Sequence, residues 1–222
     1  MDDTYTGRVA VGGPAQTRTL AGLEITKVAV GSWDNNAYLL RCRSTGATLL
    51  VDAANEPETL RALVDERGGG RLDQIVTTHR HPDHWQALAE VSESTGATTA
   101  AGREDAPELP VPAARTLDDG DEIAVGDCRL RVIGLVGHTP GSVALLFDDP
   151  QGHPHLFTGD SLFPGGVGKT VGAENFISLL DHVERRVFDR LPDETWVYPG
   201  HGGDTTLGAE RPHLGEWRTR GW

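Results

Sequence analysis

The chain has 222 residues, a formal net charge of −13 and two cysteines. This length favours a single domain, which would bury about 70% of the surface of the unfolded chain. The acidic charge opposes phosphate backbones, and two divalent cations would still leave −9 (−13 + 4), so we expect no nucleic-acid partner. There is no run of 18 apolar residues and the polar N-terminus does not resemble a secretion signal, so we expect no membrane association. Two cysteines do not make a disulfide framework, which favours a reducing, cytoplasmic location.

Apolar alternation and helical spacing predict the elements of the first half of the chain. Residues 1–20 show little pattern and are expected to form an N-terminal arm or edge segment, ahead of a domain at 21–222. The expected strands are 23–30, 37–42, 48–51, 74–76 and 97–101. The expected helices are 56–66 and 85–91, and a region rich in proline and aspartate at 105–119 is expected to be a loop.

The second half of the chain repeats this mixture of strands and helices. A hairpin is expected at 122–136, turning at Gly126 and Asp127. Further strands are expected at 143–147, 155–158 and 195–198, with an amphipathic helix at 174–190. Runs of strands with helices between them predict one α/β domain whose sheets are covered by helices.

The segment at 79–84 reads His-Arg-His-Pro-Asp-His and directly follows the apolar pair Ile75 and Val76. Neutral imidazole and carboxylate are the ligands that suit zinc, iron or manganese. Bringing three imidazoles and a carboxylate together within six residues would cost free energy unless a bound cation interacted with them. The segment therefore predicts a metal site at the end of a strand.

Three further polar residues follow expected strands, each beside glycine: His138, Asp160 and His201. Glycine lets the backbone turn sharply, so each side chain could be directed toward a shared centre. Taken singly, each residue is also typical of a turn or a cap. Taken together with the segment at 79–84, in this order along the chain, they favour a shared metal centre.

These motifs, spread over 34–208, resemble the metallo-β-lactamase superfamily of metal-dependent hydrolases. The resemblance implies a four-layer αββα sandwich with two divalent metal ions at one edge, zinc being expected and iron or manganese being the alternatives. One implied ligand set is His79, His81 and His138. The other is Asp83, His84 and His201, with Asp160 bridging the two ions.

The implied chemistry needs no serine or cysteine nucleophile. A water shared by two cations about 3.5–4 Å apart can be a hydroxide near neutral pH, and Asp83 would both ligate and orient it as the catalytic residue. Asp52 resembles the superfamily's aspartate that lies behind the metal ligands, although a strand-end cap is an equal alternative. The other four histidines are expected at the surface or in loops: His153, His155, His182 and His213.

Two segments resemble glyoxalase II, the hydroxyacylglutathione hydrolases. The segment at 33–39 is similar to its Asp-Asn-x-x-Tyr-Leu motif, and 158–170 is similar to its Gly-Asp-Thr-Leu-Phe…Gly-Cys-Gly-Lys/Arg motif. The second motif implies that Lys169 binds a substrate carboxylate, with a solvated loop lysine as the alternative. The chain departs from the family in two ways: Trp85 and Gln86 replace small residues, and about twenty residues after His201 are too few for the C-terminal helical domain.

We therefore expect a metal-dependent thioesterase of glyoxalase-II type that acts on a small-molecule acyl-thiol. The alternatives are an iron persulfide dioxygenase and a lactonase or β-lactamase-like hydrolase; a structural zinc module is disfavoured because such sites close with four ligands.

Eighteen arginines against two lysines indicate a G+C-rich genome, and some such lineages use mycothiol in place of glutathione. A thiol other than glutathione is therefore expected, while the acyl group and the oligomeric state stay open.

Overall fold

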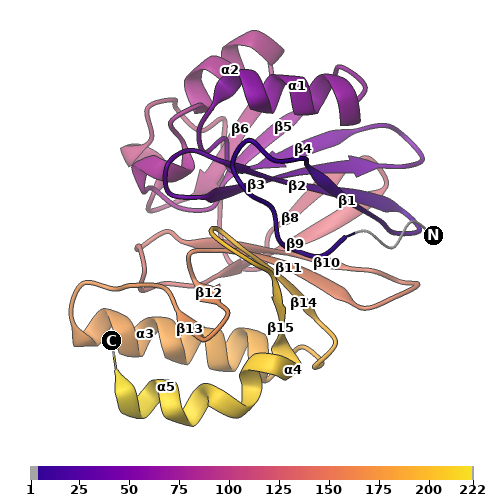
Figure 1. The fold of residues 1–222 in the computed structure, drawn as a ribbon. Helices are drawn as coiled ribbons and strands as arrows, with labels where there is room; N and C mark the ends of the chain where they lie inside the picture. The colour runs from indigo at the N-terminus through magenta and orange to yellow at the C-terminus, as the bar shows by residue number, and fades with distance from the viewer. Residues whose placement is uncertain (1–4, 222) are drawn as a thin grey trace.

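The computed structural model describes residues 5–221, so residues 1–4 of the expected N-terminal arm lie outside the described part. Two β-sheets pack face to face, and helices cover the outer face of each sheet (Figure 1). The expected four-layer αββα sandwich is confirmed. No helix within residues 5–221 is long and apolar enough to cross a membrane.

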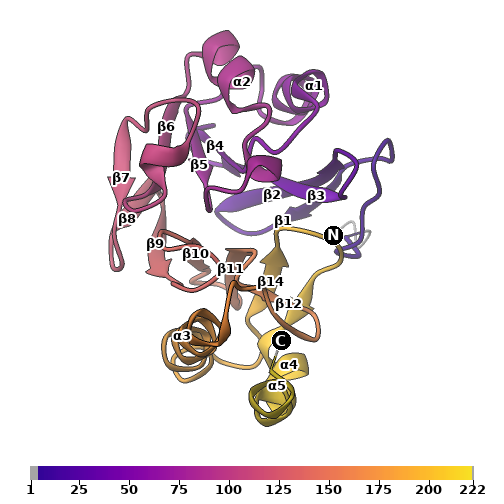
Figure 2. The same ribbon diagram turned by 90° about the vertical axis from the view of Figure 1, so that its left-hand side faces the viewer.

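The first sheet has seven strands that lie side by side in chain order. They are β1 (Gln16–Thr19), β2 (Leu23–Val30), β3 (Asn35–Cys42), β4 (Thr48–Val51), β5 (Gln74–Thr77), β6 (Thr98–Gly102) and β7 (Arg115–Leu117). Strands β1 to β4 are antiparallel, whereas β4 to β7 are parallel. Parallel neighbours need a crossover, and α1 (Pro57–Arg67) supplies it between β4 and β5 and α2 (Leu88–Thr95) between β5 and β6, both on the outer face (Figure 2).

The second sheet has six strands in the order β15-β14-β11-β10-β9-β8. They are β8 (Glu122–Val125), β9 (Cys128–Gly134), β10 (Val143–Asp148), β11 (Pro154–Gly159), β14 (Trp196–Pro199) and β15 (Thr205–Thr206). Its outer face carries α3 (Ala173–Val183), α4 (Leu207–Glu210) and α5 (Leu214–Arg220) (Figure 1). A two-stranded hairpin, β12 (Leu162–Phe163) with β13 (Gly166–Val167), forms a small sheet of its own that packs beside β11 and β14.

Three apolar layers hold the sandwich together, one between the sheets and one beneath each helical layer. Strand β3 is apolar almost throughout because both of its faces are covered. Tyr38 and Leu40 face the other sheet, while Ala37 and Leu39 face the helices. A strand buried on both faces has no side that is exposed to solvent, so it does not alternate with polar residues. The inner strands therefore read as continuous apolar runs.

Three expectations about the elements were wrong in part. The loop expected at 105–119 contains strand β7, which is three residues long and is held by pairing with β6. The helix expected from Trp85 begins only at Leu88, because Pro82–His84 forms a 3₁₀ turn first. The helix expected at 174–190 is α-helical only to Val183 and continues as a π-helical turn, Glu184–Phe188. Such short segments leave too few residues for a periodic pattern.

Candidate metal centre

The seven side chains expected as ligands meet at one edge of the sandwich, because each follows the end of a strand. The segment at 79–84 follows β5, His138 follows β9, Asp160 follows β11 and His201 follows β14. Three sets within this cluster have ligand atoms that all lie within 4.8 Å of one another. The sets are His79, His81 and His138; His79, His84 and Asp160; and Asp83, His84 and His201.

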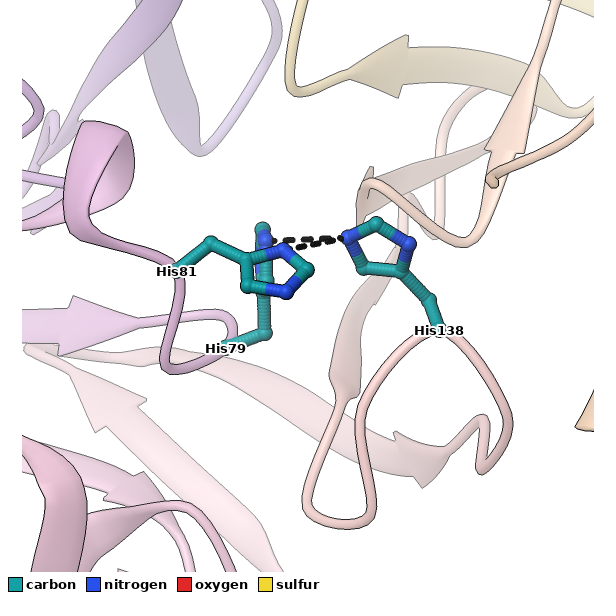
Figure 3. A group of neighbouring side chains, drawn as sticks. All are labelled: His79, His81 and His138. Atoms are coloured by element: carbon teal, nitrogen blue, oxygen red, sulfur yellow. Dashed lines mark hydrogen bonds between the residues drawn. The ribbon is translucent and has the colours of Figure 1, made fainter. Parts of the chain in front are cut away.

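The first set is made of three imidazole rings from two loops (Figure 3). His138 Nε2 lies 2.9 Å from His81 Nδ1 and 3.2 Å from His79 Nε2. His138 Nδ1 faces the carbonyl oxygen of Lys169 at 2.6 Å, so that nitrogen carries the ring hydrogen. His138 Nε2 therefore presents a lone pair to the two neighbouring ring nitrogens. Converging imidazole nitrogens of this kind fit a cation.

Asp160 lies between the first set and the remaining ligands. Its Oδ1 is 3.3 Å from His84 Nε2, and its Oδ2 is 3.6 Å from His138 Nε2 and 3.5 Å from His201 Nε2. One carboxylate thus faces histidines of both expected ligand sets. This placement fits the bridging position that the resemblance implies for it.

The remaining set joins Asp83, His84 and His201. His201 Nε2 is 3.2 Å from both Asp83 Oδ2 and His84 Nε2. On the far side of the ring, His201 Nδ1 faces the carbonyl oxygen of Trp33 at 2.9 Å, which directs Nε2 toward the cluster. Ring orientation is therefore fixed by backbone that lies outside the cluster.

Asp52 makes contacts of both kinds that its sequence position suggested. It directly follows β4 in a left-handed conformation (φ 59°), and its carboxylate accepts hydrogen bonds from the Thr78 amide at 2.7 Å and the Thr78 hydroxyl at 2.8 Å, just after the end of β5. The same carboxylate contacts His84 Nδ1 at 2.8 Å. Asp52 therefore caps the strand end and also sets the orientation of the His84 ring.

The carboxylates of the cluster control the charge of its histidines. Burial lowers the pKa of His84, but Asp160 and Asp52 outweigh burial and raise that pKa to about 10. Burial also lowers the pKa of His201, and hydrogen bonds to Asp160 and Asp83 raise it to about 10. Burial and the neighbouring histidines hold the pKa of His79 well below its usual value. Protons thus occupy positions that cations would take, and binding of cations would release them.

Two residues that sequence reasoning missed hold the ligand loops in place. Asn35 donates from Nδ2 to Asp83 Oδ2 at 2.9 Å and forms a β-bridge with His201. Asp105 is fully buried and accepts hydrogen bonds from the Arg80 amide at 3.0 Å and the Gly141 amide at 2.9 Å, joining the two histidine loops. Asn35 belongs to a quoted motif and could have been found, whereas Asp105 lies in the expected loop with no local signal.

A pocket of about 670 Å³ opens over the cluster. Its lining includes the expected ligands His81, His138 and His201 together with Trp33 and Lys169. Trp33 is 70% exposed, which is unusual for an aromatic residue that lines a pocket. The structure thus places the expected substrate residue Lys169 at the same opening as the ligands.

His155 is the histidine whose expected location was wrong. His155 was expected at the surface or in a loop, but it is fully buried within β11, with Nδ1 2.8 Å from the Tyr198 hydroxyl. Its Nε2 has no hydrogen-bond partner within residues 5–221. The ring packs beside Phe147 and Tyr198, so the expectation was wrong because the strand is covered on both faces.

Comparison with known proteins identifies the class. The metallo-β-lactamase superfamily model matches residues 30–201. The hydroxyacylglutathione hydrolase of Fuscovulum blasticum is 39% identical over 171 residues, covering 76% of this chain and 62% of that protein. The chain therefore belongs to the metallo-β-lactamase superfamily, and its resemblance to glyoxalase II is confirmed at the level of sequence.

Solved structures agree with this assignment. TTHA1623 in a di-iron-bound form is 33% identical, with a TM-score of 0.68, and the match covers 83% of this chain and 96% of that one. The BLEG-1 B3 metallo-β-lactamase has a TM-score of 0.76 at 24% identity, covering 86% of this chain and 97% of that one, which shows the shared fold. The chain spans 62–67% of the length of the hydroxyacylglutathione hydrolases that it matches first.

Proposed function

We propose that the protein is a dinuclear metal-dependent hydrolase, a thioesterase of glyoxalase-II type, with residues 21–222 as its catalytic domain. The observation that carries this proposal is the pair of adjacent ligand sets around Asp160, open to a pocket that also contains Lys169. The relatives named hydroxyacylglutathione hydrolase support a thioester over other acyl substrates.

Two divalent cations fit the donor set, because five imidazoles and two carboxylates, the side chains that zinc prefers, converge there. His79, His81 and His138 would hold one ion, Asp83, His84 and His201 the other, and Asp160 both. Zinc suits these ligands first, with iron or manganese as alternatives. When bound, the ions supply Lewis acidity and a water of lowered pKa.

Asp83 is the catalytic residue in this proposal, because it combines a charged carboxylate with a fixed position at the pocket. Burial raises its pKa, but His201 and His84 outweigh burial and hold that pKa well below its usual value. Asn35 donates to Oδ2 at 2.9 Å, so the carboxylate cannot rotate freely. Asp83 can therefore accept a hydrogen bond from an attacking water and orient it toward a carbonyl carbon.

The pocket wall suggests how an acyl-thiol would bind. Lys169 lines the wall and provides a positive charge for a substrate carboxylate. Trp33 and Val171, which are 70% and 87% exposed, offer apolar surface at the opening. On this proposal the thiol is a small molecule other than glutathione, and mycothiol is the first candidate. Mycothiol has no carboxylate, so Lys169 would then bind a carboxylate of the acyl group or donate hydrogen bonds to the hydroxyl groups of the thiol.

The test is a panel of acyl-thiols measured beside the metal content of the purified holoenzyme. We expect hydrolysis of thioesters, near two divalent ions per chain, and a higher kcat/KM for a mycothiol ester than for S-lactoylglutathione. A micromolar KM for the glutathione ester with no turnover of the mycothiol ester would overturn the choice of thiol. Oxygen uptake with one iron per chain would instead favour a persulfide dioxygenase, and turnover of lactones or lactams alone would favour the remaining alternative.

A further inference from the structure

Asp105 is a buried carboxylate to which the proposed chemistry gives no role. It lies just after β6, and the parallel neighbour of that strand, β5, leads into the segment at 79–84, so both segments leave the first sheet at the same edge. The loop that carries His138 comes from the second sheet and packs against Asp105. A Cβ added to Gly141 would lie 2.4 Å from the Asp105 amide nitrogen, so no side chain fits between them. Asp105 therefore lies where the two loops of the first ligand set meet.

The carboxylate of Asp105 accepts hydrogen bonds from both loops. Oδ2 accepts the Arg80 amide at 3.0 Å and the Thr139 hydroxyl at 2.5 Å, and Oδ1 accepts the Gly141 amide at 2.9 Å. Arg80 Nε is also 3.8 Å from Oδ1, but its side chain is 37% exposed, so this ion pair adds little. The side chain of Asp105 is fully buried, so these groups are the donors that balance its charge.

Two of these donors are next to ligands in the sequence. Arg80 lies between His79 and His81, and Thr139 directly follows His138. Each imidazole drawn in Figure 3 is thus one residue away from a hydrogen bond to the same carboxylate. His138 Nε2 lies 2.9 Å from His81 Nδ1 and 3.2 Å from His79 Nε2. Backbone held on both sides of the gap sets these separations.

The remaining ligand set is held by other contacts. Asn35 Nδ2 donates to Asp83 Oδ2 at 2.9 Å, and the Asp52 carboxylate is 2.8 Å from His84 Nδ1. Within residues 5–221, no hydrogen bond joins Asp105 to a member of that set. The two sets therefore depend on separate supporting residues.

We propose that Asp105 is a positioning residue that fixes the separation of the two loops of the first set and so determines how tightly the first ion is bound. This inference rests on the proposed dinuclear centre. A carboxylate is needed because all three partners donate. In Asp105→Asn, the NH₂ group would face either the Gly141 amide or the Arg80 amide, so one hydrogen bond would be lost and two donors would oppose each other. The substitution keeps the size of the side chain and changes the contacts between the loops.

Hydrogen exchange of the purified holoenzyme tests the positioning directly, whatever metal it contains. In Asp105→Asn we expect the amides of residues 79–81 and 138–141 to exchange at least about fivefold faster than in the parent, because an amide loses its acceptor. The amides of Asn35 and His201, which form a β-bridge, should exchange as in the parent. Unchanged exchange in both loops would overturn the proposal.

Zinc affinity, measured by competition with a chelator, tests the consequence for the ions. Asp105→Asn should weaken one of the two ions by at least about tenfold and leave the other within about twofold. Added to His138→Ala, which already removes a ligand of the first set, the substitution should cost little more. Added to Asn35→Ala, which acts on the remaining set, its effect should be additive. Equal losses at both ions, or additivity with His138→Ala, would overturn the proposal.

Two further variants complete the experiment. Thr139→Val removes one of the three hydrogen bonds and decides the proposal if Asp105→Asn does not fold: the first ion should weaken by about 2–10-fold, and an unchanged affinity would overturn the proposal. The matched control is Asp149→Asn, because Asp149 is also buried and accepts the Gln151 amide at 3.1 Å, but follows the far end of β10 from the His138 loop. This control should keep both ions. Fewer than two ions in the parent would overturn the dinuclear centre instead, and hydrogen exchange would still decide whether Asp105 positions the loops.

Discussion

Two polar clusters include residues of the loop at 199–204, and they differ in how their buried charges are balanced. One surrounds Lys27, and the other is the ligand cluster. Lys27, which is fully buried, donates to Gly7 O at 2.9 Å, Gly202 O at 2.7 Å and Asp204 Oδ1 at 2.6 Å. The other oxygen of Asp204 accepts the Tyr5 hydroxyl at 2.7 Å. All three hydrogens of the ammonium group are used, so this cluster is complete within the protein.

The ligand cluster, which includes His201 of the same loop, brings imidazole nitrogens close to one another. His138 Nε2 and His79 Nε2 face each other at 3.2 Å, and His84 Nε2 and His201 Nε2 do the same. Protein groups contact the outer nitrogens of these rings, while the inner nitrogens face one another, the carboxylates and, at His201, the Asn35 amide at 3.4 Å. The first cluster pairs its charges within the protein and stabilises the fold, whereas the converging imidazoles and carboxylates of the second are a donor set that suits cations.

The largest effect on metal content and activity is expected at Asp160, within the ligand cluster. Asp160→Ala removes the carboxylate that faces both ligand sets, so both ions should be lost together. Metal per chain should fall from near two to near zero, with activity reduced by about 10³-fold or more. His138→Ala is the matched variant and should weaken mainly the first ion. A stable single iron with full activity would contradict the dinuclear proposal.

Lys27→Met tests the complete cluster. Removing one member of a buried ion pair leaves Asp204 uncompensated, which should lower the free energy of unfolding by about 3–5 kcal/mol. Denaturant unfolding measures this, and Lys27→Met combined with Asp204→Leu should recover part of the loss. Folded Lys27→Met should still bind near two ions per chain. Loss of metal without loss of stability would show that Lys27 is needed for metal binding at the ligand cluster and would contradict this expectation.

Asp52→Asn tests whether a residue that contacts the ligand cluster from outside affects metal affinity. The amide is close in shape but cannot balance the charge of His84 or fix its ring as well. Such contacts behind a ligand typically change metal affinity by about 10–100-fold. Competition with a chelator would measure the change, and an affinity equal to that of the parent would leave Asp52 as a strand-end cap alone.

His155 gives a prediction about pH, because it is a buried polar group with an unused nitrogen. Burial and the neighbouring charges lower its pKa to about 3, whereas the unfolded chain binds that proton near pH 6.5. Stability from neutral His155 is therefore present above pH 6.5 and is lost as the pH falls from there toward 3, by up to about 1.4 kcal/mol per unit. Between pH 7 and 5, the parent should lose about 2 kcal/mol more unfolding free energy than His155→Gln. Equal losses would refute this.

The smallest effect is expected at Lys169, at the exposed rim of the pocket. If it binds a substrate carboxylate, Lys169→Ala should raise KM several-fold and change kcat less, since binding to substrate and transition state is lost equally. Lys169→Arg keeps the charge and should retain most of the affinity. An unchanged KM across thioesters would identify it as a solvated loop lysine.

The sequence by itself predicted one α/β domain with sheets covered by helices, and its resemblance to the superfamily supplied the four-layer sandwich and the expected ligand set. Apolar runs marked the inner strands, because strands covered on both faces carry no polar side. The segment at 79–84 placed four ligands within six residues, so their proximity followed from local chain geometry alone. His138, Asp160 and His201 could be added because each followed an expected strand beside glycine, and their joint resemblance to a superfamily supplied the grouping.

Only the tertiary structure decided what depends on contacts between distant segments. Asp105 joins two histidine loops, and Lys27 anchors the loop that carries His201. Neither residue stands in a local pattern that differs from an ordinary loop or strand. Their roles arise from side-chain contacts made after the sheets pack, and periodicity along the chain contains no information about which strand ends will meet.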